Sequence, residues 1–181
     1  ISLYGPGYIE DTLCGVPVRL GPLSFYQVNT PAAEQLYGVA RQFAQLQPGD
    51  TLLDLYCGMG TIGLSMAADC RELIGVEIIP EAVEGAELNA AAMGAQNARF
   101  FCADAGKAAA KLASEGLRPD VVCLDPPRKG CDEATLNAVI TMGPRRIVMV
   151  SCNPATAARD CRCLADRGYT PARAAAADRL P

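Results

Sequence analysis

One cysteine in this sequence stands where a reactive thiol could stand. The segment VMVSCNPATAARD, residues 148–160, places Cys152 at the end of an apolar run, followed by Asn-Pro and helix-forming residues. Such a thiol is either packed away as a small apolar side chain or favoured as a thiolate nucleophile by the amides of the helix N-terminus. Taken alone, the segment favours the buried structural cysteine, so the choice depends on the rest of the chain.

A glycine-containing turn is the second candidate site. The segment LLDLYCGMGTIGL, residues 52–64, predicts a strand ending near Tyr56, a turn, and a helix from about Thr61. Gly58 and Gly60 would let the backbone approach a ligand closely. The spacing is not the GxGxxG dinucleotide pattern, and a lone glycine turn is weak evidence. An acid followed by alternating glycines resembles the first motif of Rossmann-like AdoMet-dependent methyltransferases, with Tyr56 replacing that pattern's first glycine.

Two acids follow the next predicted strands. Glu77 ends IGVE, and an acid there can accept hydrogen bonds from both ribose hydroxyls of a nucleoside; alone, it is equally an ordinary solvated glutamate. Asp104, in FFCADAG, could meet the adenine amino group, cap the following helix, or do both. Together with the glycine turn, these positions favour a nucleoside site.

A rigid turn carries a further acid. In VCLDPPRKG the two prolines stiffen the backbone after Asp125, which could be held against a planar base. Amino-group methyltransferases use a similar tetrapeptide with an aromatic residue after the prolines. Here Arg128 takes that place, which weakens the amino-methylating interpretation. Arg128 and Lys129 could instead contact RNA phosphates, or be two solvated surface cations.

Alternating apolar and amphipathic segments must position these residues. The pattern predicts an α/β fold with a Rossmann-like, doubly wound, mostly parallel sheet, which binds its ligand beyond the carboxyl ends of the strands. We expect strands at 51–56, 73–78, 98–102, 120–125 and 146–151, and helices at 62–69, 80–93, 105–115, 132–142 and 154–167. An earlier helix begins at Asn29 or Thr30 and stops at Pro48-Gly49, and YTPARAAAAD could add a last strand.

The composition limits the domain organisation, the location and the kinds of catalytic site that this chain can have. The 181 residues suit one globular domain, taken here as a β segment at 1–30 followed by a catalytic domain at 31–181. No run is long and apolar enough to span a membrane. The nine scattered cysteines argue against a disulfide framework and indicate a cytoplasmic location, with most thiols in the core. The absence of histidine excludes Cys-His or Ser-His-Asp chemistry, and no metal site is expected. The net charge of −4 does not favour nucleic acid by itself.

Five segments together carry a specific resemblance. They are SFYQVN (24–29), DLYCGMGTIGL (54–64), GVE (75–77), DPPRKG (125–130) and SCNPATAARD (151–160). Their order resembles that of RNA uracil-5-methyltransferases of the RumA/TrmA type, where an aromatic at the position of Tyr56 is usual. The serine-cysteine-asparagine-proline run is the most discriminating segment.

The resemblance implies a role for individual residues. Cys152 matches the nucleophile that adds to C6 of uracil and activates C5. The positions that match S-adenosyl-L-methionine contacts are Gln27, Tyr56, Thr61, Glu77, Asp104 and Asp125. The match at Asp104 is the less secure, because that region varies. The resemblance thus implies methyl transfer to C5 of a uridine flipped out of its stack, with S-adenosyl-L-homocysteine as product.

The resemblance also implies parts beyond these residues. The family's general base is a glutamate shortly after an Asp-x-hydrophobic-Pro segment; the chain reaches DRLP at Asp178–Pro181, so we expect that base just beyond Pro181. N-terminal RNA-binding and iron–sulfur modules are expected only in a longer protein. We expect a monomer acting on RNA, with 23S rRNA favoured over tRNA. The alternatives are an amino-group (N6/N4-type) nucleic-acid methyltransferase and a non-catalytic AdoMet- or RNA-binding module.

Overall fold

A parallel β-sheet forms the centre of the protein. The computed structural model describes residues 8–21 and 29–176. All five strands of the main sheet run in the same direction, in the order β5-β4-β3-β6-β7. The strands are β3 (Thr51–Leu55), β4 (Glu72–Glu77), β5 (Ala98–Cys102), β6 (Val121–Leu124) and β7 (Arg146–Met149). The expected doubly wound, Rossmann-like α/β fold is confirmed.

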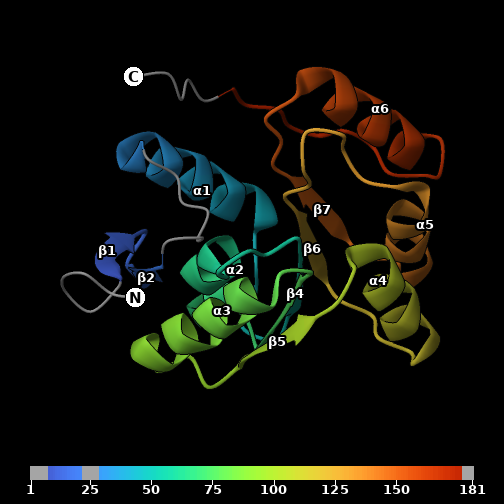
Figure 1. Cartoon of the computed structure of the whole chain (residues 1–181). Helices are drawn as coiled ribbons and strands as arrows, with labels where there is room; N and C mark the ends of the chain where they lie inside the picture. Colours follow the sequence, from blue (N-terminus) through green and yellow to red (C-terminus); the bar gives the residue numbers. More distant parts are fainter. Residues whose placement is uncertain (1–7, 22–28, 177–181) are drawn as a thin grey trace.

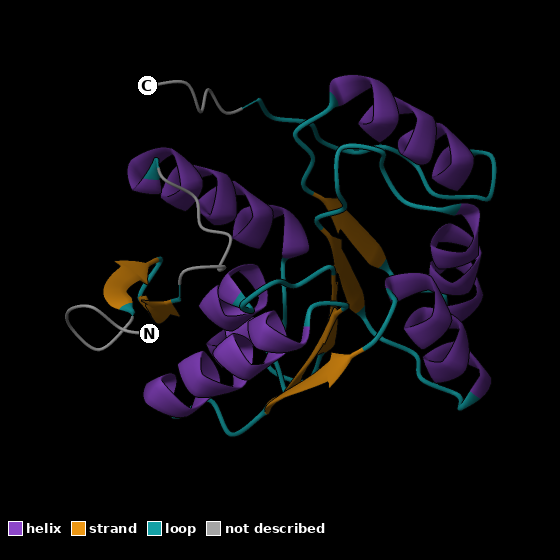
Figure 2. Ribbon diagram, in the orientation of Figure 1, coloured by secondary structure: helices purple, strands orange, loops and turns teal. Residues whose placement is uncertain are grey.

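Helices cover both faces of this sheet (Figure 1). They are α1 (Thr30–Ala44), α2 (Thr61–Met66), α3 (Pro80–Met93), α4 (Ala105–Ser114), α5 (Glu133–Met142) and α6 (Pro154–Ala165), with a short 3-10 turn at Ala67–Asp69 after α2. Helices α1, α2 and α3 lie on one side and α4, α5 and α6 on the other, so that the purple helices flank the orange strands in Figure 2. The result is a three-layer sandwich.

The side-chain alternation of β3 explains the two layers of core. Every residue of this strand is buried, as expected of a central parallel strand. Leu52 packs into the cluster with the α1–α3 side, whereas Leu53 and Leu55 pack into the cluster with α4, α5 and α6. Because successive side chains of a strand point to opposite faces, a strand apolar throughout must be covered twice.

The N-terminal β segment is a hairpin. Strands β1 (Ile9–Leu13) and β2 (Val16–Leu20) pair antiparallel in a separate two-stranded sheet. The buried Leu13, Val16 and Val18 join the same apolar cluster as α1. The expected short strands at the start of the chain are therefore present, and the segment 22–28, with most of SFYQVN, lies outside the described residues.

Several elements differ from the sequence-based expectation: helix α1 ends at Ala44, before the expected stop at Pro48-Gly49, and most other strands and helices differ by one or two residues at an end. The helix expected at 62–69 is α-helical only to Met66 and tightens into the 3-10 turn. The last strand proposed for YTPARAAAAD is wrong: none of its described residues, 169–176, is in a strand. Small alanine side chains offer little to pack on a sheet, and Pro171 has no N–H for a ladder. Of the helices described, none is long and apolar enough to cross a membrane.

Candidate active site

The residues singled out in the sequence lie at one edge of the sheet. Since all five strands are parallel, their carboxyl ends meet along a common edge. In spatial order across that edge, following β5, β4, β3, β6 and β7, the residues are Asp104, Glu77, Tyr56, Asp125 and Cys152. Consecutive connections run one way from β3 to β5 and the other way from β6 to β7, so the chain changes direction between β3 and β6. Doubly wound folds bind ligands at such a switch point.

The glycine turn after β3 adopts an unusual backbone. Tyr56 has a φ of 64°, and Gly58 and Gly60 have φ values of 54° and 78°. A non-glycine residue in this region is strained, and such strain is concentrated at functional sites. A Cβ at Gly60 would lie 3.1 Å from the Phe100 ring, whereas a Cβ at Gly58 would meet nothing within 4 Å. Gly60 is therefore required for packing, and Gly58 faces open space that a ligand can approach.

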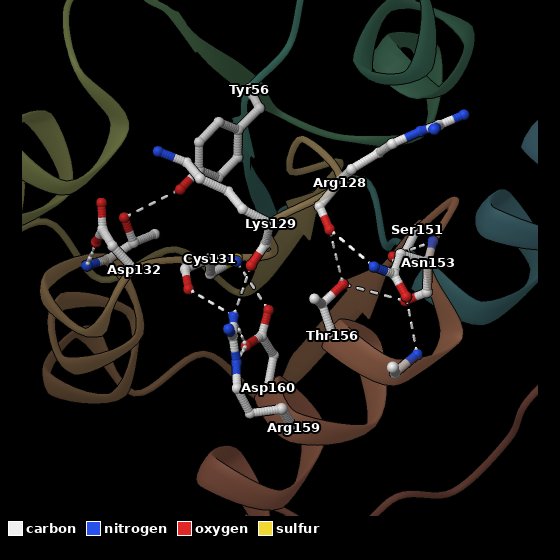
Figure 3. Close-up of polar contacts among 12 residues, drawn as sticks. Tyr56, Arg128, Lys129, Cys131, Asp132, Ser151, Asn153, Thr156, Arg159 and Asp160 are labelled. Carbon is white, nitrogen blue, oxygen red and sulfur yellow. Dashed lines mark hydrogen bonds and ion pairs between the residues drawn. The ribbon is translucent and has the colours of Figure 1, made fainter.

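Tyr56 contacts the α5 side of the sheet. Its hydroxyl lies 3.2 Å from the hydroxyl of buried Thr135 on α5, and its ring packs on the cluster beneath α4 and α5 (Figure 3). Burial raises the pKa of Tyr56 to about 12. The phenol therefore stays protonated over the physiological pH range and forms a neutral hydrogen bond.

Glu77 joins the end of β4 to the glycine turn. One carboxylate oxygen accepts from the Gly58 N–H at 3.0 Å, and the other accepts from the N–H groups of Ile78 and Ile79 at 2.7 and 3.0 Å. The carboxylate is thus held in one orientation. Since each oxygen has about two acceptor sites, the oxygen that accepts from Gly58 keeps capacity for one hydroxyl donor.

Asp104 is the N-cap of α4. Its side chain accepts from the Lys107 N–H at 3.0 Å. The capping role foreseen as one of its two readings is confirmed. Contact with an adenine amino group stays a prediction, and the second carboxylate oxygen leaves capacity for it.

Asp54 is a buried acid beneath the same edge. It is fully buried in β3, one oxygen accepts from the Gly63 N–H at 3.0 Å, and the other has no hydrogen-bond partner among the described residues. Burial, followed by the negative charge of Asp125, raises its pKa to about 7; Glu77 adds to the shift, and the Gly63 bond opposes it. The charges of Asp125 and Glu77 that contribute to this shift make the edge an electronegative environment that favours a cationic ligand.

Cys152 is exposed, immediately before helix α6. The N-cap of α6 is Asn153, whose side chain accepts from the Ala155 N–H at 3.1 Å. By contrast, Cys57 and Cys123 are buried, and burial raises both pKa values far above the usual range. Only four of the nine cysteines are buried, which is fewer than expected: Cys57, Cys70, Cys123 and Cys131.

The start of α6 is bound to the loop that follows Asp125. The Asn153 amide donates to the Arg128 carbonyl at 3.0 Å, and the Thr156 hydroxyl donates to the same carbonyl at 3.3 Å (Figure 3). The side chains of Arg128 and Lys129 are themselves exposed. The carbonyl of one segment is thus held by two side chains of the other.

A second set of bonds joins the same segments deeper in the protein. Asp160 is 1% exposed and accepts from the Cys131 N–H at 2.8 Å. Arg159 donates to Asp160 at 2.7 Å and to the carbonyls of Lys129 and Cys131 at 3.0 and 3.1 Å (Figure 3). We call the bonds from Asn153, Thr156, Arg159 and Asp160 to residues 128–131 the α6 latch. The sequence contained the helix N-cap signal at Asn153 but no signal for these long-range partners.

Some predicted residues are not brought into contact. Gln27 lies outside the described residues, so its role stays a prediction. Thr61 is the first residue of α2 and half-buried. Among residues 8–21 and 29–176, no three His, Cys, Asp or Glu side chains are grouped to hold a metal ion.

The chain is similar to a known family over most of its length. A profile of the family described as tRNA (Uracil-5-)-methyltransferase matches residues 18–181. An uncharacterised RNA methyltransferase of Halalkalibacterium halodurans is 47% identical over 167 residues, which are 92% of this chain and 36% of the relative. One of Lactococcus lactis is 48% identical over 160 residues, 88% of this chain and 35% of the relative. The chain thus spans about a third of the length of these relatives.

Solved methyltransferase structures have the same fold. The Pyrococcus abyssi tRNA (uracil-54, C5)-methyltransferase, solved in complex with S-adenosyl-L-homocysteine, matches with a TM-score of 0.73 and 29% identity over 88% of this chain and 38% of that chain. The Geobacter metallireducens precorrin-6y C5,15-methyltransferase shares the fold, with a TM-score of 0.66 and 18% identity over 76% of this chain and 72% of that one. Because the family profile covers nearly the whole chain, the protein belongs to the tRNA (uracil-5-)-methyltransferase family.

Proposed function

We propose that this chain is the AdoMet-binding and nucleophile-bearing part of an RNA uracil-5-methyltransferase, with 23S rRNA favoured over tRNA as substrate. The observation that supports it most directly is the placement of Cys152, exposed at the same sheet edge as Glu77 and Asp125. Nine free thiols fit a reducing, cytoplasmic compartment.

The sheet edge fits S-adenosyl-L-methionine. The open space over Gly58 admits a ligand, and the fixed Glu77 carboxylate retains acceptor capacity for a ribose hydroxyl. The negative charges of Asp125 and Glu77, which help to raise the pKa of Asp54, give this edge a negative potential that suits a cofactor with a sulfonium and an ammonium group. When bound, the cofactor supplies an electrophilic methyl group. The further residues proposed as cofactor contacts are Gln27, Tyr56, Thr61, Asp104 and Asp125.

Cys152 would supply covalent activation. Addition of its thiolate to C6 of uracil forms an S–C6 bond and moves the C5–C6 electron pair into an enolate, which makes C5 nucleophilic. After C5 is methylated, a base removes the C5 proton, and the electrons of that C–H bond restore the C5–C6 double bond and expel the thiolate. Exposure of Cys152 beside the N-terminus of α6 suits this role, since the helix dipole favours negative charge there.

Two features disfavour methylation of an amino group. Arg128, and not an aromatic side chain, follows the two prolines, and it is exposed. The exposed thiol also has no role in direct transfer to nitrogen.

A covalent trapping experiment tests the proposal. Incubation with S-adenosyl-L-methionine and RNA containing 5-fluorouridine should yield a stable protein–RNA adduct, because fluorine at C5 cannot leave as a proton does. Cys152→Ala should abolish this adduct, whereas Cys102→Ala, at the other exposed cysteine, should not. Equal adduct with Cys152→Ala would refute the assignment of the nucleophile, and methyl found on an exocyclic nitrogen would refute C5 chemistry.

A further inference from the structure

We propose that Arg159 and Asp160 are positioning residues that hold the Cys152 segment against the loop 128–131. This inference rests on the proposed function, since it concerns the placement of the proposed nucleophile. It arises from the α6 latch, which no sequence motif or comparison assigns to a task.

The latch begins where the sheet ends. The last backbone hydrogen bond between the extensions of β6 and β7 runs from the Val150 N–H to the Leu124 carbonyl at 2.8 Å. Beyond it, the chain after β6 enters the loop 128–131 and the chain after β7 carries Cys152 into α6. Past that point, the bonds described between the two segments are those of the latch. Their relative position therefore depends on side chains.

Both carboxylate oxygens of Asp160 take part in this contact. Its carboxylate is buried, and such a charge is costly unless paired and hydrogen-bonded. One oxygen takes the Cys131 N–H, and the other takes Nε and Nη2 of Arg159 at 2.8 and 2.7 Å. Arg159 then reaches the two loop carbonyls with the same Nη2. Within the planar guanidinium fork, Nη2 has two N–H groups for three acceptors, so one of its hydrogens is shared between two of them, while Nε donates to Asp160 alone.

The loop has no room for a side chain at position 130, where the arginine–aspartate pair lies. Gly130 has a φ of 79°, and a Cβ there would lie 2.5 Å from both Arg159 Nη2 and Asp160 Oδ2. Any side chain at this position would displace the arginine–aspartate pair. By comparison, Gly15 has a φ of 78° and a Cβ there would meet nothing within 4 Å.

The nucleophile is next to this contact. Cys152 directly precedes Asn153, which caps α6 and donates to the Arg128 carbonyl. A shift of the loop against α6 would therefore move the thiol relative to the Asp125 turn. Asp125 itself is held separately, because its N–H donates to the Leu55 carbonyl of β3 at 3.4 Å. Loss of the latch should thus impair the covalent step while leaving cofactor binding intact.

The test compares matched variants of this chain. Arg159→Ala removes the arginine bonds of the α6 latch, and Arg162→Ala, on the same helix and ion-paired to exposed Asp166, is its control. Gly130→Ala displaces the latch, and Gly15→Ala controls for the cost of a side chain at the same φ. Arg159→Lys keeps a charge beside Asp160 but cannot form the fork, and it serves if the alanine variants fold poorly.

Three quantities separate positioning from general destabilisation. We expect the adduct rate with 5-fluorouridine RNA, at saturating RNA and cofactor, to fall roughly ten- to hundred-fold in Arg159→Ala and Gly130→Ala, since small misplacements of reacting groups have effects of that size. The dissociation constant for S-adenosyl-L-homocysteine should stay within about twofold, because loss of the latch leaves the β3–β5 edge intact. Amide hydrogen exchange of Cys131 should become faster in both variants and in neither control.

The outcomes are distinguishable. If wild type forms no adduct, the proposed function fails, and hydrogen exchange and the rate of Cys152 alkylation still decide whether the latch holds the two segments together. If wild type reacts and Arg159→Ala and Gly130→Ala react equally fast, the positioning inference is overturned. A parallel loss of cofactor affinity and adduct rate would also overturn it, because that pattern is one of general structural damage.

Discussion

The Gly58 N–H donates to the Glu77 carboxylate at 3.0 Å, which joins the glycine turn after β3 to the end of the neighbouring strand β4. Glu77 is thereby part of the backbone framework as well as a candidate ligand contact. A substitution there should affect both properties.

Glu77→Gln should weaken cofactor binding. Glutamine offers one acceptor oxygen where glutamate uses two, so either the Gly58 bond or the Ile78 and Ile79 bonds must be lost. We expect S-adenosyl-L-homocysteine to bind at least about tenfold more weakly and the free energy of unfolding to fall by about 1 kcal/mol. Titration calorimetry measures the first, with exposed Glu81→Gln as control. An unchanged affinity would remove Glu77 from the cofactor site.

Asp54→Asn should flatten the dependence of stability on pH. The pKa of Asp54 is raised to about 7 in the folded protein, against 3.8 as its ordinary value. Between these values the folded state keeps the proton and the unfolded state releases it, so stability falls as pH rises towards 7. The loss attributable to this group is roughly 4 kcal/mol at most.

Urea unfolding at pH 5 and pH 8 measures this effect. The difference between the two pH values should be smaller in Asp54→Asn than in wild type, whereas Asp166→Asn, at an exposed site on α6, should behave as wild type does. Identical pH dependence in Asp54→Asn and wild type would show that Asp54 is ionised in the folded protein.

Gly75→Ala should destabilise the sheet. A Cβ at this position of β4 would overlap the Phe100 ring and approach the Cys57 sulfur to 3.0 Å. We expect the free energy of unfolding to fall by roughly 1–3 kcal/mol, the usual cost of overpacking. Gly49→Ala, where a Cβ would meet nothing within 4 Å, should change stability by less than about 0.5 kcal/mol.

A double-mutant cycle identifies the clash as the cause. In the presence of Phe100→Leu, which removes ring atoms, Gly75→Ala should be less costly than in wild type. Additive losses of stability would mean that the phenylalanine ring is not what a larger residue at position 75 meets.

The exposed cysteine thiols should react with an alkylating reagent before the buried ones. Cys102 and Cys152 are exposed, whereas Cys57 and Cys123 are buried and have strongly raised pKa values. Brief treatment of the native protein with iodoacetamide, followed by peptide mass spectrometry, should therefore find label on the first pair before the second. Early labelling of Cys123, in the central layer of β6, would contradict the described fold.

Sequence reasoning located the sheet edge because the signals there are local. Each strand of the main sheet is a nearly continuous apolar run, and the acids and Cys152 directly follow those runs. Parallel pairing then brings them together without knowledge of any tertiary contact. The capping role of Asp104 was foreseen for the same reason.

Long-range contacts were not predictable in this way. The bonds of Asp160 and Arg159 span about 30 residues, and an Arg-Asp pair in a helix is normally an exposed feature. The hydroxyl of Tyr56 contacts Thr135 from α5, a partner 79 residues away that the sequence does not indicate, and its contact with the cofactor stays a prediction. The erroneous last strand arose because an alanine-rich segment has little pattern of its own to identify it.

The strand order β5-β4-β3-β6-β7 has a consequence for divergence within the family. Under the proposed function, most residues for the common cofactor follow β3, β4 and β5, within the uninterrupted stretch 51–104. The exceptions are Gln27 and Asp125, and the nucleophile that meets the RNA follows β7, within the later stretch 121–165. Selection for a new target uridine can therefore act on the second half of the sequence while the first half remains under constraint from a metabolite that every member shares.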